Sequence, residues 1–305
     1  MHDQSQIDFE TILAGAALRV EAMLDAVLAA RPLLGEIDRP QRLLAAMRHG
    51  VLNGGKRLRP FLVMESAALF GADGEAILRV AAALECVHSY SLVHDDLPAM
   101  DDDDLRRGQP TVHKAFDEAA AILAGDALLT LAFDILADPA TELDARAKVE
   151  LVGKLARAAG IGGMVGGQAL DLAAERDAPD EVGIIRLQAM KTGALIRFAC
   201  EAGAIAAGAP QDDIERLAEF GSAIGLAFQL ADDLLDHTST PEAMGKATGK
   251  DAAAGKATLV ALHGEAWARR QLGGLVTQAR DLIAPYGDRA AILMATARFV
   301  AERQR

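Results

Sequence analysis

Apolar residues recur at three- and four-residue steps along almost the whole chain, and this period constrains the fold more than any other feature. The first such stretch starts at Phe9, and Arg31-Pro32 ends it. Similar stretches cover residues 40–52, 60–70, 74–97, 113–137, 144–160, 181–208, 211–236 and 260–283. No run of alternating apolar and polar residues interrupts them, and no Asn-Gly or Asp-Gly turn lies between β-rich segments. The sequence therefore predicts an all-α protein.

The connections between these stretches are short, and none of them has the composition of a domain linker. Gly54-Gly55 and Ala178-Pro179 are typical of helix–helix turns. No low-complexity tract interrupts the 305 residues, so we expect one helical domain over residues 1–305. The stretch from His237 to Lys256 is rich in Gly, Thr, Ala and Lys, and this composition favours a mobile loop.

Composition and charge exclude several kinds of protein. Hydrophobic residues make up 51% of the chain and aromatic residues only 4%, which suits close-packed helices around a sizeable core. The net charge of −13 argues against a nucleic-acid partner, because phosphate backbones need a basic face. Cys86 and Cys200 show no pairing pattern and are expected to be buried thiols. The N-terminal residues do not resemble a signal peptide, and no apolar run approaches the ~20 residues of a membrane span, so we expect a cytoplasmic protein.

The most acidic part of the chain follows the apolar stretch that ends at His94. Asp95, Asp96 and Asp101 lie there, and three more aspartates come directly after them. Carboxylates this close together repel each other unless a cation lies between them. Mg²⁺ is the best candidate, because it binds through one or two carboxylates, water and substrate phosphates. Pro98 removes a helical hydrogen bond, so the helix must loosen before Asp101 can reach the same ion as Asp95.

A second acidic cluster of similar form is the segment Asp232-Asp233-Leu-Leu-Asp236. Asp232 and Asp236 are four residues apart, so both carboxylates project from one helix face and suit shared ligation of a metal. Gln229 lies near the same face. Either cluster alone fits equally well with the solvated acidic end of a helix. Two clusters in matching contexts favour several Mg²⁺ ions that face one polyphosphate ligand.

Cations lie where a phosphate ligand would need them. Three of them follow a flexible glycine pair in the segment Gly54-Gly-Lys-Arg-Leu-Arg-Pro60. Arg106 and Arg107 directly follow the first acidic cluster, and guanidinium groups bind phosphate oxygens bidentately. Simpler explanations also fit. The segment 54–60 could be a turn with solvated basic residues, and Arg106 and Arg107 could be counter-charges to the neighbouring aspartates. His88 and His94 lie just before the first cluster, and a histidine on an apolar helix is more often a core residue than a ligand.

Together these segments resemble the ordered signature of the trans-prenyltransferases. This is the polyprenyl synthetase family of isoprenyl diphosphate synthases, and the bacterial farnesyl diphosphate synthases are the most similar group within it. The matching segments, in sequence order, are residues 54–60, 92–108, 166–171, 191–193 and 228–236. The resemblance runs from about Arg42 to Lys256, and no position that the chemistry needs departs from the family pattern.

The resemblance implies a fold and a set of roles. The family fold is an all-α isoprenoid-synthase bundle around a deep central cavity, usually in a homodimer. The implied ligands of Mg²⁺ (three ions per site, with Mn²⁺ as an alternative metal) are Asp95, Asp96, Asp101, Asp232 and Asp236. The residues implied to contact the allylic diphosphate are Arg106, Lys191, Thr192, Gln229, Lys246 and Lys256. Those implied for isopentenyl diphosphate are Lys56, Arg59, His88 and Arg107, with Phe228 lining the pocket. The implied catalytic residues are Asp95, Asp101, Arg106, Lys191 and Asp232.

The implied reaction is the head-to-tail condensation of isopentenyl diphosphate with dimethylallyl or geranyl diphosphate, which gives farnesyl diphosphate and diphosphate. Side chains about one helical turn before Asp95 would form the cavity floor and limit the product length. Ser91 lies near the same helix face as Asp95. Tyr90 lies well off that face on an ideal helical wheel, so a blocking role for its ring depends on the resemblance. In the family, an aromatic ring at one of these positions goes with a C15 product.

Four alternatives remain open at this point. A geranyl (C10) or geranylgeranyl (C20) diphosphate synthase would share these motifs. A terpene cyclase shares the fold but typically lacks the basic site formed by Lys56, Arg59 and Arg107. A non-catalytic subunit of a heteromeric prenyl synthase would be expected to have lost aspartates, and this chain keeps both clusters. A generic helical metal-binding protein would leave the ordered cations without a role.

Overall fold

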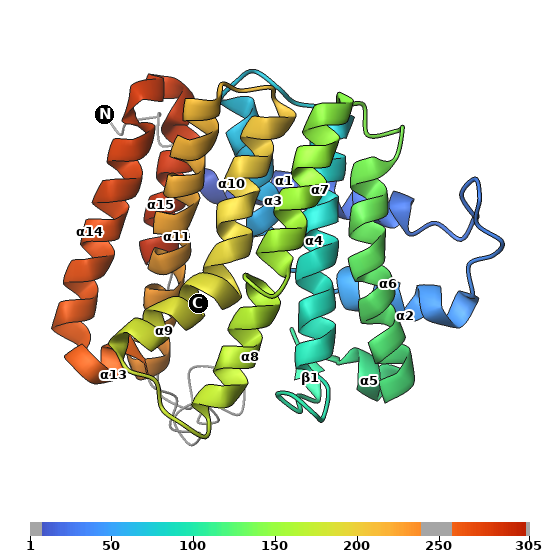
Figure 1. Ribbon diagram of the computed structural model, residues 1–305, viewed down its shortest axis with the longest axis horizontal. Helices are drawn as coiled ribbons and strands as arrows, with labels where there is room; N and C mark the ends of the chain where they lie inside the picture. Colours follow the sequence, from blue (N-terminus) through green and yellow to red (C-terminus); the bar gives the residue numbers. More distant parts are fainter. Residues whose placement is uncertain (1–7, 239–257, 303–305) are drawn as a thin grey trace. The chain divides into compact units, whose positions relative to one another are not determined.

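The computed structural model describes residues 8–238 and 258–302, and nearly all of the described chain is helical (Figure 1). The predicted all-α class is confirmed. By its internal packing the chain divides into two compact units, Met1–Gly153 with Ile205–Gly208, and Lys154–Ala204 with Ala209–Arg305. The single domain expected over residues 1–305 stays a prediction.

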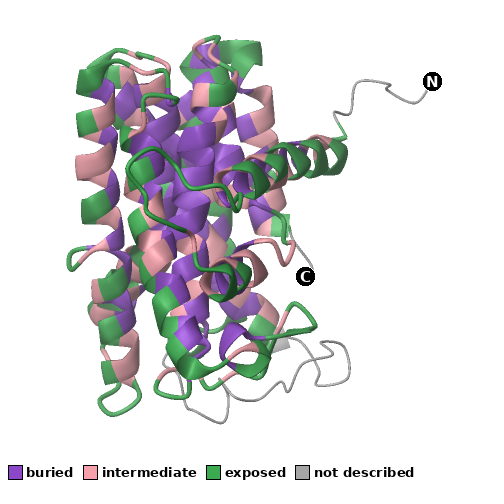
Figure 2. Cartoon of the chain, turned by 90° about the vertical axis from the view of Figure 1, so that its right-hand side faces the viewer, coloured by how far each residue is buried: buried purple, intermediate pink, exposed green. Residues whose placement is uncertain are grey.

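The first unit is organised around helix α4, which has buried residues on every side, as expected for a helix surrounded by others. It packs against α1, α2, α3 and α6. The connection between α1 and α2 is exposed along most of its length (Figure 2). The helices of this part of the chain are α1 (Phe9–Val27), α2 (Gln41–Val51), α3 (Leu58–Ala68), α4 (Glu75–Asp95), α5 (Val112–Ala115), α6 (Glu118–Ala137) and α7 (Ala145–Ala159).

A small hairpin in the first unit differs from the expectation of helices without strands. Strands β1 (Leu105–Arg106) and β2 (Gln109–Pro110) pair antiparallel, and Arg107 and Gly108 form the turn between them. Both turn residues have positive φ, 53° and 78°, the backbone that tight two-residue hairpins require. This turn carries no recognisable sequence signal, because an arginine occupies the position where Asn or Asp usually stands.

Helices α4 and α6 are each long and apolar enough to cross a membrane by length and composition. This differs from the expectation that no apolar run approaches that length. In α4, 72% of the apolar window is buried, which is typical of the core helix of a soluble protein. In α6 only 39% is buried, so this helix keeps a partly exposed apolar face.

The second unit is built around the long helix α11, which packs against α13, α14, α15 and the π-helical turn η1. Its core includes the buried rings of Phe198 and Phe220. Helix α8 packs against α9 and η1. The elements are α8 (Met164–Ala174), α9 (Glu181–Gln188), η1 (Ala189–Gly193), α10 (Ala194–Ala206), α11 (Gln211–Thr238), α13 (Leu259–His263), α14 (Glu265–Ile283), the 3₁₀ helix η2 (Ala284–Ala290) and α15 (Ala291–Glu302).

Several helix boundaries differ from the predicted stretches. The predicted helix 113–137 is two helices, because Asp117 caps α6 by accepting a hydrogen bond from the backbone N–H of Ala120. The predicted helix 260–283 breaks at Gly264, which has φ of 82°. Helices α8 and α15 lie outside all predicted stretches. The predicted mobile loop began at His237, but α11 continues to Thr238, and residues 239–256 lie outside the described residues.

Candidate active site

The first aspartate cluster lies where α4 ends. The helix stops at Asp95, and the chain turns back so that the backbone N–H of Asp101 donates to the backbone carbonyl of Asp95 at 2.8 Å. The turn holds the two residues together although six positions separate them, and the helix loosens before Pro98 as predicted. Both side chains are half-buried. This arrangement suits a hard cation with oxygen ligands shared between Asp95 and Asp101.

Asp96 is placed differently from these two residues. It is buried, and the guanidinium of Arg106 contacts both of its carboxylate oxygens. Nε of Arg106 donates to Oδ1 at 2.8 Å and to Oδ2 at 3.0 Å, and Nη2 donates to Oδ1 at 2.5 Å. Burial raises the pKa of Asp96, and the hydrogen bond from Arg106 opposes that rise. Asp96 therefore positions Arg106 beside the cluster, and its role as a metal ligand stays a prediction.

In the basic segment after α2, Arg57 is buried, whereas Lys56 and Arg59 are more accessible. Arg57 is buried, with φ of 50°, at the N-terminus of α3. Its Nη1 donates to the buried carboxylate of Glu85 at 2.6 Å, and its Nη2 donates to the backbone carbonyl of Val51 at 2.6 Å. Arg57 thus ties the segment to the end of α2 and to α4. Lys56 is exposed.

Three predicted isopentenyl diphosphate ligands belong to one basic cluster, which we define as Arg57, Arg59, Arg107 and His88. Nη1 of Arg59 lies 3.3 Å from Nε2 of His88, and because a guanidinium only donates, this ring nitrogen accepts. Nη1 of Arg107 donates to Oδ1 of Asn53 at 2.8 Å and also to the carbonyl of Gly54. Side chains from α3, α4 and the hairpin turn therefore meet around the glycine segment.

The electrostatics of the basic cluster favour an anion. Burial, and then the charges of Arg59 and Arg107, hold the pKa of His88 well below its usual range. His88 is therefore neutral at pH 7, as its acceptor role requires. Burial also lowers the pKa of Arg59, and the charge of Arg107 adds to this effect. A Cβ at Gly55 would lie 2.5 Å from Cζ of Arg107, so this close approach requires glycine.

In the second unit, the aspartate cluster on α11 contains a network of amide hydrogen bonds. Asp233 is buried, and its carboxylate accepts from Nε2 of Gln188 at 2.8 Å and from Nε2 of Gln229 at 3.0 Å. Oε1 of Gln229 accepts from the hydroxyl of Thr192 at 3.1 Å. The network fixes the predicted ligands Gln229 and Thr192 relative to each other.

The predicted metal ligands Asp232 and Asp236 lie one turn apart within the unbroken helix α11. Asp232 is half-buried and Asp236 is exposed. The predicted pocket residue Phe228 is half-buried on the same helix, one turn before Asp232. Lys246 and Lys256 lie outside the described residues.

Lys191 and Thr192 belong to η1, a π-helical turn between α9 and α10. Nζ of Lys191 donates to Oδ2 of Asp171 on α8 at 2.5 Å. A Cβ at Gly167 would overlap the backbone of Lys191, so α8 can pack this closely only with glycine there. Single π-helical turns frequently occur at functional sites, and this one continues directly from α9 into α10 without a break in the helical path.

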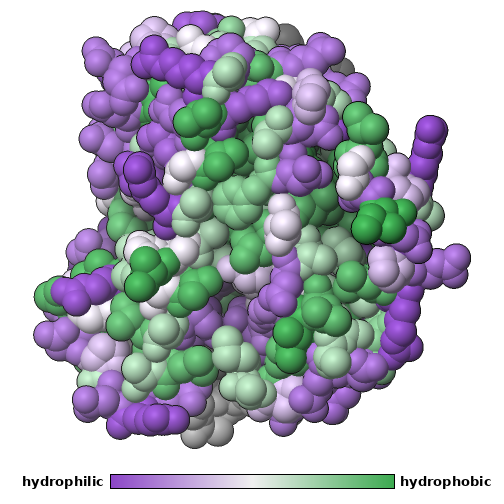
Figure 3. All heavy atoms as spheres, turned by 45° about the vertical axis from the view of Figure 1, so that its right-hand side comes forward, coloured by the Kyte–Doolittle hydropathy of each residue, from purple (hydrophilic) through white to green (hydrophobic). Residues whose placement is uncertain are grey.

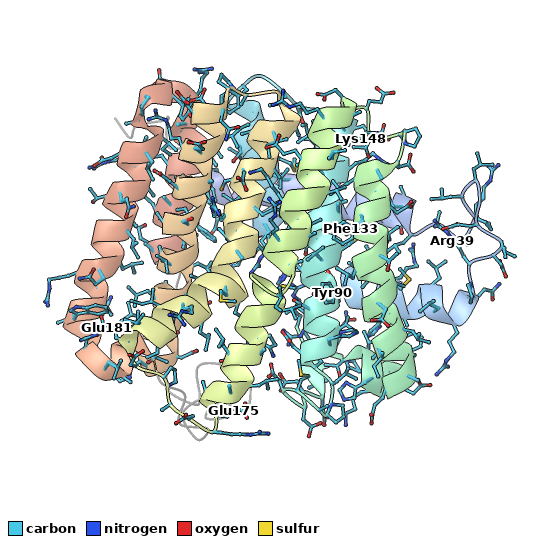
Figure 4. All side chains as sticks on the ribbon, in the orientation of Figure 1. Arg39, Tyr90, Phe133, Lys148, Glu175 and Glu181 are labelled. Carbon is cyan, nitrogen blue, oxygen red and sulfur yellow. The ribbon has the colours of Figure 1, made fainter. Side chains whose placement is uncertain are left out.

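The predicted chain-length residues Tyr90 and Ser91 lie on α4, which packs against α6. Tyr90 is 5% exposed, and its ring packs edge to face against His94, with ring centroids 5.8 Å apart (Figure 4). His94 donates from Nε2 to the carbonyl of Ile122 on α6 at 3.0 Å. Burial, and then the charge of Asp95, raise the pKa of Tyr90 to about 12. The hydroxyl of Ser91 donates to the carbonyl of His88 at 2.8 Å, and Ser91 is half-buried whereas Tyr90 is buried.

Sequence reasoning missed the residues that support the predicted site. Glu85, Asp171, Gln188 and Asp233 each bond to a site residue or to the basic segment. Glu85 carried a signal, because it is the one carboxylate between Glu75 and Asp95 in an otherwise apolar run, and a buried charge needs a partner. The contacts of Gln188 had no comparable signal.

Within residues 8–238 and 258–302, one further group has the ligands to hold a metal. Carboxylate oxygens of Asp102 and Asp104 and a ring nitrogen of His113 lie within 4.8 Å of one another. Asp104 also pairs with Lys114 at 2.8 Å, and both aspartates are exposed. The donor set is mixed oxygen and nitrogen, whereas the Asp95–Asp101 turn offers oxygen alone, the ligand type that Mg²⁺ prefers.

Comparisons with known proteins agree on one family. Residues 40–280 match the family described as polyprenyl synthetase. The chain is 45% identical over 268 residues to farnesyl diphosphate synthase of Escherichia coli, which covers 86% of this chain and 90% of that protein. It is 40% identical to the heterodimeric geranylgeranyl pyrophosphate synthase large subunit 1 of Arabidopsis thaliana, over 99% of this chain and 81% of that protein. A crystal structure of an FPP/GFPP synthase from Zymomonas mobilis superposes with a TM-score of 0.86 at 45% identity, and covers 97% of this chain and 99% of that one.

Proposed function

The chain belongs to the polyprenyl synthetase family and is a prenyltransferase, and from this premise we propose that it is a Mg²⁺-dependent farnesyl diphosphate synthase. It would condense isopentenyl diphosphate with dimethylallyl or geranyl diphosphate, head to tail, and release diphosphate. The relatives include synthases of both farnesyl and geranylgeranyl diphosphate.

One observation carries the proposal most strongly: two kinds of diphosphate anchor lie along one helix. His88, in the basic cluster, and Asp95, in the aspartate turn, are seven residues apart on α4. Seven residues of α-helix span about 10 Å. This spacing supports a cation-lined site for one diphosphate and a metal-binding site for the other, with the reacting carbons between them.

The oxygen-rich donor set at Asp95 and Asp101 fits Mg²⁺, and we propose Asp232 and Asp236 as further Mg²⁺ ligands. When bound, the ions neutralise charge on the leaving diphosphate. Arg106, held by Asp96, and Lys191, held by Asp171, add preorganised positive charge for the same purpose.

The remaining steps follow from the charges. Departure of the allylic diphosphate leaves an allylic carbocation, which water would quench, so apolar walls must exclude water. The C3–C4 double bond of isopentenyl diphosphate attacks this cation. Loss of a proton from C2 then forms the new double bond, and the released diphosphate accepts that proton. No described side chain is needed as the base.

The buried ring of Tyr90 supports a C15 product. A closely packed interior resists displacement of a ring, so a growing chain that reaches Tyr90 would stop there. A C20 product remains the main alternative, because several relatives are geranylgeranyl pyrophosphate synthases. A C10 product would need a shallower floor than Tyr90 provides.

We also propose a homodimer, with the exposed apolar face of α6 as its interface. Ile122 and Leu123 on this face are 46% and 55% exposed. Hydrophobic residues gather rather than stand singly on the side of the molecule that Figure 3 shows. Exposed apolar patches of this kind mark association surfaces. Light scattering on the wild type and on Ile122→Glu would test this, since the variant should shift towards monomer and an unchanged mass would contradict the interface.

The activity is tested by incubating the purified chain with isopentenyl diphosphate, Mg²⁺ and each allylic diphosphate in turn. Product chain length is then measured. We expect farnesyl diphosphate from both the dimethylallyl and the geranyl substrate. A mainly C20 product would favour the geranylgeranyl alternative. Absence of any product from the chain alone would favour the non-catalytic subunit and overturn the proposal.

A further inference from the structure

Glu85 is a buried anion within a cluster that is otherwise cationic. Its side chain is 2% exposed, and Oε1 accepts from Nη1 of Arg57 at 2.6 Å. Its charge also acts on Arg59 and Arg107, whose cationic forms it stabilises against burial and mutual repulsion. Glu21 is a second anion near Arg57, at 3.3 Å, but its side chain is 33% exposed. Solvent therefore screens Glu21 far more than Glu85.

We propose that Glu85 is a counter-charge that stabilises the empty anion site and weakens its hold on a diphosphate. The proposal rests on the proposed function, in which the basic cluster binds isopentenyl diphosphate. In the empty site the arginines repel one another, and the Glu85 carboxylate offsets that repulsion. Once a diphosphate is bound, the ligand supplies the negative charge, and the fixed carboxylate then repels it.

In the proposed reaction, weaker binding of the diphosphate by the basic cluster would help the product to leave. The bond that breaks joins the allylic carbon to its own diphosphate, which leaves with the electron pair. The bond that forms joins that carbon to C4 of isopentenyl diphosphate, so the longer product keeps the diphosphate that entered with isopentenyl. The product is therefore still held by the basic cluster after condensation. It must leave this cluster before the next isopentenyl diphosphate can enter, and a tighter cluster would slow turnover.

The key variant is Glu85→Gln, which keeps an oxygen acceptor for Arg57 and removes the charge. We expect a lower thermal midpoint for the empty protein. We also expect tighter binding of inorganic diphosphate and of isopentenyl diphosphate by calorimetry, on the order of tenfold, the scale of one partly buried charge interaction. In turnover, KM for isopentenyl diphosphate and kcat should both fall. Glu85→Asp keeps the charge and should bind both ligands like the wild type.

Glu201→Gln is the matched control, because Glu201 is also buried in an ion pair, with Lys154 at 2.6 Å, on other helices. It should lower the thermal midpoint and leave both dissociation constants unchanged. The comparison with this control separates the proposal from a purely structural role of Glu85. If the role were purely structural, Glu85→Gln would lower the thermal midpoint equally with and without ligand.

The outcomes separate the two proposals. If the wild type binds diphosphate and Glu85→Gln binds it equally or more weakly, the counter-charge proposal is overturned and the proposed function stands. If the wild type binds neither ligand, the assignment of the basic cluster fails and the counter-charge proposal falls with it. If Glu85→Gln folds only with diphosphate present, that rescue supports the proposal. Failure to fold even with saturating diphosphate overturns it.

Discussion

Individual aspartates in the first cluster are placed in two different ways. Asp95 and Asp101 are brought together by the backbone turn, whereas Asp96 is buried under Arg106. A carboxylate that binds the metal contributes mainly to the transition state, where the leaving diphosphate gains charge. The same distinction separates Asp232 from Asp233, which the amides of Gln188 and Gln229 hold.

We expect Asp95→Ala and Asp232→Ala each to lower turnover by orders of magnitude, because each removes charge stabilisation that acts in the transition state. Steady-state kinetics with saturating Mg²⁺ would measure this. Asp281→Asn is the control, because that aspartate is exposed and pairs with the neighbouring Arg280. Normal turnover in either alanine variant, or in the wild type with EDTA, would contradict the metal mechanism.

Arg59→Ala should raise the KM for isopentenyl diphosphate more than the KM for the allylic substrate. The reason is that Arg59 belongs to the basic cluster with His88, which we assign to isopentenyl diphosphate. Arg19→Ala removes an exposed arginine paired with Asp73 and should change neither value. An effect on the allylic substrate alone would remove Arg59 from the isopentenyl site.

His88 should make stability depend on pH in a specific window. Its pKa in the folded protein lies well below the ordinary value near 6.5, so below about pH 6.5 the unfolded chain binds a proton that the native protein does not. Stability should therefore fall as pH falls through this window, by up to about 1.4 kcal/mol per pH unit for this one group. His88→Gln keeps an acceptor for Arg59 and should show a smaller loss between pH 7 and pH 5 in urea unfolding. Equal losses in the two proteins would show that His88 is charged in the native state.

Among the elements, the contact between α4 and α6 bears on the proposed product length, because Tyr90 and His94 lie on α4 and His94 bonds to α6. Gly125 on α6 faces the ring of His94, and a Cβ there would overlap it. His94 in turn sets the position of the Tyr90 ring. The sequence predicted both helices, and the role of Tyr90 in product length stays a prediction. It could not predict this contact, because a helical wheel places Tyr90 relative to Asp95 and contains nothing about the neighbouring helix.

Gly125→Ala should destabilise the protein by about 1–3 kcal/mol, the usual cost of overpacking. Gly153→Ala on α7 is a matched control, because a Cβ there meets nothing within 4 Å and alanine favours helix. Urea unfolding of both variants would measure the difference. A Gly125→Ala variant as stable as the wild type would show that the two helices can move apart freely.

Tyr90→Ala should shift products towards C20 or longer, because it removes the ring that closes the floor. Tyr90→Phe keeps the ring and should still give C15. Chromatography of the dephosphorylated products would distinguish these lengths. Unchanged chain length in Tyr90→Ala would place the floor elsewhere.

For the whole molecule, helical periodicity was sufficient to predict the fold class, because apolar residues recur at every helical turn along most of the chain. Periodicity did not predict the hairpin at 105–110, because its turn depends on the positive φ of Arg107. It also did not predict α8, because the glycines of this helix interrupt the apolar pattern. The predicted ligands come from charge, spacing and the family resemblance, and they stay predictions. The residues that hydrogen-bond to these ligands, such as Asp171 with Lys191, could not be predicted. Such contacts depend on which helices pack together, and the helical pattern of the sequence does not show this.

The central claim is that this chain condenses isopentenyl diphosphate with an allylic diphosphate in a metal-dependent step. The most direct measurement is the ratio of diphosphate released to isopentenyl units incorporated, with radiolabelled isopentenyl diphosphate and geranyl diphosphate as substrates, with Mg²⁺ and with EDTA. A metal-dependent condensation predicts a ratio of about one and a C15 product with Mg²⁺. With EDTA it predicts neither release of diphosphate nor incorporation of isopentenyl units, because departure of the diphosphate and formation of the new bond belong to one reaction. Release of diphosphate without incorporation, or incorporation that continues in EDTA, would contradict it.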